Sequence, residues 1–353
     1  MPAASPALVS RMRSIVYSRP GTSSVLSLAE REPAQPGPGE VRVKVAVSGV
    51  NPTDWKARVG SSGALAFDEI VPNQDGAGVV DALGDGVTEL SVGDRVWLYL
   101  AQHQRPTGTA QEYTVVPAAR AVRLPEGVGF DVAASLGVPA MTAHRALTVH
   151  EAGPARLSPG ALQGRAVLVA GGAGAVGHAA IQLAVWAGAT VIATISSDEK
   201  AALALAAGAH HVVNYREGDT AEQIAAFAPA GVDHIVEVSL AQNAALDGQV
   251  VANHGSIAYY ADNGGDQATL PVRPTFAKNV RTQGLLLYTV GDLALTAAAE
   301  DITAALRDGA LPVGEQAGLP LTWFTLEETA AAHDAVEHGA VGKVLIDVAG
   351  DNR

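Results

Sequence analysis

Three glycines in the middle of the chain have a spacing that suits phosphate binding. Gly172, Gly174 and Gly177 lie in GGAGAVG, with the spacing G-x-G-x-x-G. An apolar strand, AVLVA, comes directly before them, and an Ala-rich helical stretch begins within them. In such a turn we expect Gly172 to make the bend, Gly174 to let the backbone approach a pyrophosphate, and Gly177 to let the helix pack on the strand. This context predicts a dinucleotide-binding turn, with a purely structural turn as the alternative.

The residues after the next strand, ATVIATI, bear on whether the dinucleotide is NAD(H) or NADP(H). NAD-binding proteins place an Asp or Glu here against the ribose 2′-hydroxyl. In this chain Ser196 and Ser197 come first. Ser196 and Glu199 have the S-x-x-E spacing of a capping box. The acidic residues would then lie in the first turn of the following helix, where they neutralise backbone donors and the helix dipole. Ser196, Ser197 and Lys200 would then face a 2′-phosphate, which predicts NADP(H); Lys200 as an ordinary surface lysine is the alternative.

Two kinds of sequence pattern surround these residues and predict two domains. From Met12 to about Pro139, short β-branched runs such as EVRVKVAVSGV and QEYTVVP alternate with Gly and Pro, which predicts an antiparallel β region. Beyond it, strands alternate with Ala-rich helices, the pattern of a parallel sheet. A last strand, GKVLIDV, follows two helices. We therefore expect an α/β protein with a first domain over 1–139, a dinucleotide-binding domain over 140–290, and a return over 291–353 that completes the first domain.

The composition excludes several functions. Without a single cysteine in 353 residues, the chain cannot form a disulfide, a thiolate zinc site, an iron–sulfur cluster or a cysteine nucleophile. A formal net charge of -13 disfavours nucleic acid and anionic membranes as partners. No apolar run approaches the roughly 20 residues of a membrane helix, and no signal peptide is recognisable, so we expect a cytoplasmic protein. Residues 1–11, rich in Ala, Pro and Ser, are expected to be a flexible extension.

Further motifs occur in a fixed order along the chain. They are NPTDWKARVG (51–60), GDRV (93–96), GVPAMTAHRAL (137–147), GAHHVVNYRE (208–217) and GKVLI (342–346). With the glycine turn, they make the chain resemble the zinc-independent quinone oxidoreductases of the medium-chain dehydrogenase/reductase superfamily, with the zeta-crystallins as the nearest subgroup. The resemblance runs from about Met12 to Val348. It implies a GroES-like, β-rich catalytic domain interrupted by a Rossmann domain with a doubly wound parallel sheet.

The zinc ligands of related alcohol dehydrogenases are missing. This chain reads NPTD where those enzymes carry a Cys, and NQDGAG (73–78) where they carry Gly-His-Glu. His333 and His338, the closest pair of histidines on one predicted helix, are five residues apart, so their rings point to different faces. We expect this pair to lie on a solvated helix surface, and we expect no metal site.

The resemblance also implies cofactor contacts at individual positions. Asn51 would lie beside the nicotinamide ribose and the substrate, Thr142 on the nicotinamide side, and Tyr215 on the adenosine side. Each has a structural alternative: a turn former before proline, a helix-packing residue, and an aromatic residue at a strand end. Further implied cofactor-binding positions are Ala173, Ala175 and Val176 in the glycine turn, Ser239, Tyr259, the backbone at Leu286, and Lys343.

Hydride transfer to a conjugated acceptor is the chemistry that suits a site without a metal, because the π system of the acceptor spreads the negative charge. A hydrogen-bond donor at the substrate oxygen would stabilise the anion that forms. The candidates are Asn51, Lys56 and Tyr260. Lys56 stands where many relatives have a tyrosine, so a phenol expected there is missing. Asp54 is interpreted as a local helix cap.

We expect a small hydrophobic quinone or enone as the substrate. Two other functions stay open. One is a reductase of 2-alkenals or enoyl thioesters, although residues 12–139 show no Lys/Arg cluster for a coenzyme A tail. The other is an NADP(H)-binding protein with a structural or sensor role. The family also implies a homodimer or homotetramer, paired through an edge strand within VRTQGLLL (280–287).

Overall fold

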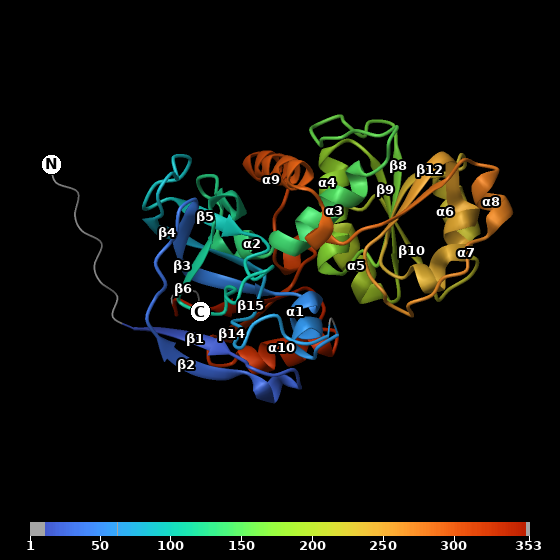
Figure 1. Cartoon of the computed structure of the whole chain (residues 1–353). Helices are drawn as coiled ribbons and strands as arrows, with labels where there is room; N and C mark the ends of the chain where they lie inside the picture. Colours follow the sequence, from blue (N-terminus) through green and yellow to red (C-terminus); the bar gives the residue numbers. More distant parts are fainter. Residues whose placement is uncertain (1–10, 62, 351–353) are drawn as a thin grey trace. The chain divides into compact units, whose positions relative to one another are not determined.

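The computed structural model describes residues 11–61 and 63–350, which divide into two compact units (Figure 1). Unit 1 contains the described residues up to Val138 and again from Leu321, and unit 2 is Pro139–Pro320. The return expected from residue 291 is therefore wrong by 30 residues (321 minus 291). The reason is helix α9 (Asp292–Arg307), whose buried face packs on helix α4 (Ala175–Trp186) of unit 2. The expected flexible extension over 1–11 lies outside the described residues, apart from Arg11.

Unit 1 is built on a mainly antiparallel sheet, as its sequence pattern predicts. The strand order is β14-β15-β3-β4-β5-β7, with β6 also paired to β3. The strands are β3 (Glu40–Val50), β4 (Asp75–Leu83), β5 (Arg95–Leu98), β6 (Tyr113–Pro117), β7 (Ala121–Arg123), β14 (Leu321–Thr325) and β15 (Lys343–Asp347). A separate antiparallel pair joins β1 (Met12–Val16) to β2 (Ser27–Arg31). Among the strands described in this unit, β14 and β15 are the one pair that runs parallel, because helix α10 (Thr329–Glu337) carries the chain back between them.

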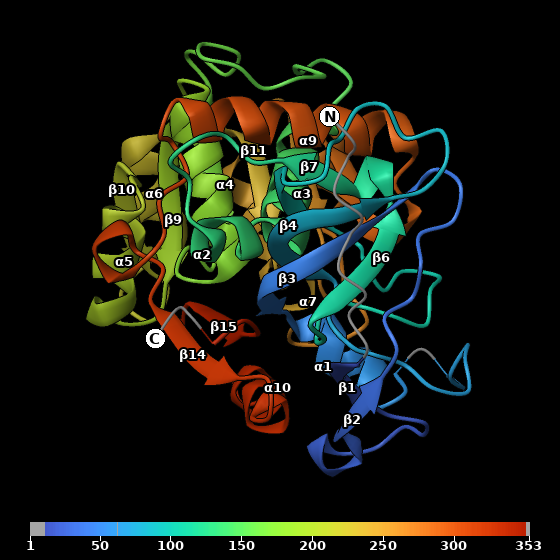
Figure 2. The same ribbon diagram turned by 90° about the vertical axis from the view of Figure 1, so that its left-hand side faces the viewer.

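Strand β3 is the centre of this sheet. Its β-branched side chains at Val41, Val43, Val45 and Val47 are buried. Strand β4 runs along one side, while β6 and β15 share the other side, pairing with the first and the last residues of β3 (Figure 2). Helix α1 (Pro52–Arg58) starts just after β3, with proline at its first position, and α2 (Phe130–Ala134) packs on β3, β4 and β5. The end of β3 thus lies beside the starts of β4 and β15.

Unit 2 is a doubly wound Rossmann sheet, so the predicted fold class is confirmed. Its six strands are all parallel, in the order β10-β9-β8-β11-β12-β13, which reverses direction beside β8. They are β8 (Ala166–Ala170), β9 (Thr190–Ile195), β10 (His211–Asn214), β11 (Val232–Glu237), β12 (Val251–Tyr259) and β13 (Arg281–Gly284).

Helices cover both faces of that sheet (Figure 1). Helices α4 and α5 (Asp198–Ala206) pack on one face, and α6 (Thr220–Phe227) and α7 (Leu240–Val250) on the other. The remaining helices are α3 (Gly137–Thr148), which begins at the boundary of the two units, and α8 (Val272–Phe276). The core residues Leu168, Ile192, Ile235 and Ile257 come from four neighbouring strands. Within the described chain, none of the helices combines the length and the apolar character needed to cross a bilayer.

Candidate functional site

The glycine turn leads from β8 into α4 and leaves little room for side chains. Gly171 has a φ of 69°, so this residue makes the left-handed bend that we expected at Gly172. A Cβ at Gly172 would lie 2.8 Å from the Cβ of Ala193 in β9, and a Cβ at Gly177 would lie 2.4 Å from the carbonyl oxygen of Gly171. Helix α4 therefore packs directly on the turn, which agrees with the packing role expected for Gly177.

Gly174 is exposed at the N-terminus of α4. Gly174 is its N-cap residue, and no described side chain caps the helix there. A Cβ at Gly174 would have a single neighbour within 4 Å, the carbonyl oxygen of Gly171 at 3.5 Å. The first-turn N–H groups, which begin at Ala175 and Val176, have no partner within the helix. A helix end of this kind attracts a phosphate.

Ser196 and Lys200 form a polar pair at the end of β9. The Nζ atom of Lys200 donates to the Oγ atom of Ser196 over 3.2 Å. The expected capping box of Ser196 and Glu199 is wrong, because Ser197 is the N-cap of α5 and its hydroxyl accepts the backbone N–H of Lys200 at 3.4 Å. A hydrogen bond from Ser197 lowers the pKa of Glu199. The capping role thus falls to Ser197 and leaves Ser196 paired with Lys200.

The other predicted cofactor positions of unit 2 lie mostly at the same edge of the sheet. Tyr215 follows β10, Ser239 follows β11, Tyr259 ends β12 and Leu286 follows β13. The carboxyl ends of parallel strands meet at one edge, so these residues share an edge with the glycine turn. Tyr215 donates its backbone N–H to Ile195 and is 51% exposed. Thr142 is on α3 and is buried.

Glu237, the last residue of β11, and Asp247 on α7 form a buried acidic pair that was missed in the sequence. Glu237 accepts hydrogen bonds from the backbone of Ser239 and, at 3.1 Å, from the side chain of Asn243. Burial, and then the negative charge of Glu237, raise the pKa of Asp247 to about 9. Burial and Glu237 also raise the pKa of Tyr260, whose backbone N–H donates to the Glu237 carbonyl. Its phenol therefore holds its proton at neutral pH. The available signal was an acidic residue within the apolar run VDHIVEV.

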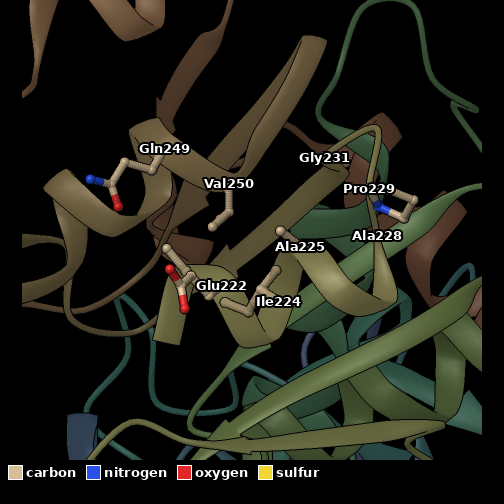
Figure 3. Close-up of a pocket in the computed structure, with 9 residues that line it drawn as sticks. Glu222, Ile224, Ala225, Ala228, Pro229, Gly231, Gln249 and Val250 are labelled. Atoms are coloured by element: carbon tan, nitrogen blue, oxygen red, sulfur yellow. The ribbon is translucent and has the colours of Figure 1, made fainter. Parts of the chain in front are cut away.

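A pocket of about 320 Å³ lies elsewhere in unit 2 (Figure 3). Its apolar wall includes Ile224, Ala225 and Val250, and Glu222 and Gln249 supply polar groups. It adjoins the loop that enters β11 and the end of α7, which places it toward the amino ends of the strands. The glycine turn follows the carboxyl end of β8, so this pocket is not the predicted cofactor site.

A buried polar cluster in unit 1 surrounds Asn51. Asn51 follows β3, Asp75 begins β4 and Lys343 begins β15. The Nδ2 atom of Asn51 donates to Oδ2 of Asp75 at 2.6 Å, and Nζ of Lys343 donates to Oδ1 of Asn51 at 2.7 Å. Nζ also lies 3.4 Å from Oδ2 of Asp75. None of the three residues is more than 2% exposed. The ammonium of Lys343, expected at the cofactor, is thus held between Asn51 and Asp75.

Asp54 joins this cluster from helix α1. Its Oδ2 atom accepts the backbone N–H of Asn51 at 2.7 Å, which agrees with the predicted helix cap, and its Oδ1 atom accepts that of Gln74 at 3.1 Å. Burial, and then the negative charge of Asp75, raise the pKa of Asp54 to about 8. Lys56 lies on the same helix, with Nζ 6.0 Å from the centre of the Trp55 ring. The role of Asp75 was missed; the available signal was a carboxylate at the first position of an apolar strand.

His333 is fully buried, so the expectation of a solvated helix surface is wrong for this residue. Helix α10 packs on β3 and β15, and Nε2 of His333 lies 2.9 Å from Oδ1 of Asn73. Burial lowers the pKa of His333 to about 3, so the ring is neutral. His338 is exposed, as expected. Over residues 11–61 and 63–350, no group of three or more His, Cys, Asp or Glu side chains could hold a metal ion.

Comparison with known proteins gives matches in both units. Residues 37–126 match the alcohol dehydrogenase GroES-like domain, and residues 175–303 match the zinc-binding dehydrogenase domain. The quinone oxidoreductase of Homo sapiens is 30% identical over 314 residues, which cover 87% of this chain and 88% of the human protein. A 2-haloacrylate reductase of Burkholderia is 33% identical over 218 residues, which cover 60% of this chain and 61% of that enzyme.

Solved structures agree with these matches. A mycobacterial protein in complex with NADPH superposes with a TM-score of 0.79 at 27% identity, over 96% of this chain and 100% of that one. The two units and the matched domains define an oxidoreductase of the medium-chain dehydrogenase/reductase superfamily. Within this superfamily, the chain belongs to the quinone oxidoreductase family. The resemblance found in the sequence is therefore confirmed.

Proposed function

We propose that this protein is an NADPH-dependent reductase that transfers a hydride to a quinone or another conjugated enone without a metal ion. The observation that carries the choice of cofactor is the Ser196–Lys200 pair at the end of β9. An ammonium beside a hydroxyl suits the 2′-phosphate of NADPH, whereas an acidic side chain there would suit the 2′-hydroxyl of NADH. The similarity to a mycobacterial protein solved with NADPH supports the same cofactor.

The described residues fit a dinucleotide in other respects. The uncapped N-terminus of α4 suits the pyrophosphate, and the open space at Gly174 allows the close approach of its oxygens. Tyr215, next to the end of β9, suits the adenosine side. When bound, NADPH supplies the hydride. We further propose that Thr142, Ser239, Tyr259 and Leu286 contribute to binding, as the family resemblance implies.

The task of the protein side chains is to orient the acceptor and to stabilise the charge that develops on its oxygen. The Asn51 amide is the donor best fixed by its surroundings, because both of its polar atoms are held by charged groups. Tyr260 keeps its phenolic proton and is a second possible donor. We propose no metal in this step, because the chain has no cysteine and its NQDGAG segment contains no histidine.

The 2-haloacrylate reductase supports a second candidate function, the reduction of a conjugated carbon–carbon double bond in a small alkenal or acid. A panel of quinones, 2-alkenals and enoyl thioesters, assayed by NADPH oxidation, separates these substrate classes. Tight NADPH binding without turnover on any acceptor would support a structural or sensor role.

The cofactor assignment is tested with Lys200→Ala. We expect the KM for NADPH to rise by about tenfold to a hundredfold, because a phosphate loses one charged hydrogen bond, while the KM for NADH changes little. Lys44→Ala removes an exposed lysine in the other unit and serves as the matched control. Equal effects of Lys200→Ala on both cofactors would contradict the assignment.

We also propose that the protein forms a homodimer through β13. This strand is at the end of its sheet, so one of its edges has no strand partner among the described residues. Val272 (72% exposed) and Phe276 (61%) lie on the preceding helix α8. An open edge beside exposed apolar side chains is a common pairing surface. Sedimentation equilibrium of the wild type and of Phe276→Glu tests this, and a monomeric wild type would contradict it.

A further inference from the structure

The carboxamide of Asn51 has two different ends, and each of them meets a charged group. Its Nδ2 atom carries two hydrogens, one of which is donated to the Asp75 carboxylate. Its Oδ1 atom accepts a hydrogen bond from the Lys343 ammonium. Rotation of the amide by 180° would place its oxygen against a carboxylate and its nitrogen against an ammonium. Only one orientation satisfies both neighbours.

Strand register brings these residues together from distant parts of the sequence. In the β3–β4 ladder, Gly49 lies opposite Asp75, and in the β15–β3 ladder, Val344 lies opposite Val50. Asn51 and Lys343 are therefore the next pair beyond the β15–β3 ladder. The three residues come from adjacent strands of one sheet, which is a rigid support for a functional side chain.

Both charged groups are held in place by close backbone packing. The Oδ1 atom of Asp75 accepts the backbone N–H of Val138 at 2.8 Å, and a Cβ at Gly137 would lie only 2.0 Å from that oxygen. The stem of Lys343 lies over Gly49, where a Cβ would come within 3.1 Å of Cε. Burial raises the pKa of Asp75, while the Lys343 ammonium and the hydrogen bonds that both Asp75 oxygens accept oppose this shift. A buried ion pair of this kind often adds little net stability, so another role is needed to explain it.

We propose that Asp75 and Lys343 are positioning residues for Asn51. They hold the Asn51 amide so that the second hydrogen of Nδ2 is donated to the carbonyl oxygen of the quinone or enone substrate. This inference rests on the proposed reduction of a conjugated carbonyl. The second hydrogen has no acceptor among the residues that the structure describes. Lys343 then acts through Asn51 and makes no direct contact with the cofactor.

A double-mutant cycle tests the proposal in the full-length enzyme. Asp75→Asn is nearly isosteric and keeps an oxygen for the Val138 N–H, but it places an amide donor against Nδ2 of Asn51. With p-benzoquinone as acceptor, we expect kcat to fall by about tenfold or more, with less than a threefold change in the Kd for NADPH. In the Asn51→Ala background, Asp75→Asn should have no further effect on kcat. A purely structural role would give the same fold-change in both backgrounds and would overturn the proposal.

Lys343→Met separates positioning from cofactor binding. We expect a loss of kcat similar to that of Asp75→Asn, with the Kd for NADPH again almost unchanged. A tenfold or greater rise in that Kd, at an unchanged kcat, would make Lys343 a cofactor ligand and would overturn the proposal.

The orientation of Asn51 is also measurable without turnover. In protein labelled with ¹⁵N-asparagine, the side-chain amide of Asn51 should show one strongly downfield, slowly exchanging hydrogen, and Asp75→Asn should remove this signal. If the wild type reduces none of the acceptors, the proposed function fails, yet this spectrum still decides the positioning. Two ordinary, rapidly exchanging hydrogens in the wild type would overturn it.

Discussion

The glycine turn allows a sharp prediction, because two of its glycines differ in what an added methyl group would meet. At Gly174, a Cβ has one contact, at an ordinary 3.5 Å from the carbonyl oxygen of Gly171. Its backbone, with φ -81° and ψ 162°, is also open to alanine. At Gly177, a Cβ would lie 2.4 Å from the same oxygen and 3.0 Å from Cα of Gly172. The two alanine variants should therefore fail in different ways.

Gly174→Ala should leave the fold almost unchanged and weaken cofactor binding. Alanine makes the unfolded chain less flexible, which adds roughly 0.4–1 kcal/mol to the free energy of unfolding. Alanine is also a poorer N-cap than glycine, which removes a similar amount. The methyl group occupies the space where phosphate oxygens would meet the first turn of α4. Loss of one charged hydrogen bond costs roughly 1.5–3 kcal/mol, which weakens NADPH binding by about tenfold to a hundredfold.

Gly177→Ala is the matched control and should show the opposite pattern. Forcing a methyl group against backbone atoms lowers the free energy of unfolding by roughly 1–3 kcal/mol. The better helix propensity of alanine restores up to about 1 kcal/mol of it. We expect Tm to fall by a few degrees. Thermal unfolding and NADPH fluorescence titration of both variants provide the readouts. If Gly174→Ala binds NADPH as tightly as the wild type, the pyrophosphate does not lie against this turn, and the assignment is refuted.

Three further predictions concern the buried ionisable groups. Lys343→Met removes the counter-ion of buried Asp75 and should lower the free energy of unfolding by roughly 3–5 kcal/mol in urea denaturation; a change below about 1 kcal/mol would contradict the ion pair. The pKa of Asp54 is raised from 3.8 to about 8, so wild-type stability should fall as the pH rises through this window, and Asp54→Asn should remove that decline; parallel stability curves would contradict it. Burial lowers the pKa of His178 from 6.5 to about 4. As the pH drops through that range, the unfolded chain takes up a proton at His178 before the folded protein does, so stability should fall. His178→Gln keeps a donor for the carbonyl of Ala317, 2.8 Å from the histidine Nε2 atom, and should lose less stability between pH 7 and pH 5; an equal loss would show that His178 is not responsible.

The local patterns of the sequence predicted most of the fold. The apolar run before GGAGAVG is β8, and the Ala-rich stretch after it is α4. The alternating runs of the first region pair as an antiparallel sheet. These elements were predictable because hydrophobic periodicity reports directly on which face of a strand or helix is buried. The location of α9 was not, since its amphipathic pattern shows that one face is buried but not which unit covers it.

The site was less predictable than the fold, for two physical reasons. The N-cap of a helix is a single residue, and the sequence pattern did not show whether Ser196 or Ser197 caps α5. Because Ser197 is the N-cap, the hydroxyl that pairs with the Lys200 ammonium is that of Ser196. Long-range pairing is invisible in local patterns. Asp75 and Lys343 are 268 positions apart, and only the registers of β4 and β15 on β3 bring them to Asn51. The buried state of His333 has the same origin, since helix α10 turns it toward Asn73.

The most direct test of the proposed reaction is the rate of NADPH oxidation by the purified, chelator-treated enzyme with a quinone as acceptor, compared with 2-alkenals and enoyl thioesters. We predict that the quinone gives the highest kcat/KM, that NADPH is strongly preferred over NADH, and that chelation leaves the rate unchanged. A higher kcat/KM with an alkenal or a thioester, or activity that disappears on chelation and returns with zinc, would contradict the proposed function.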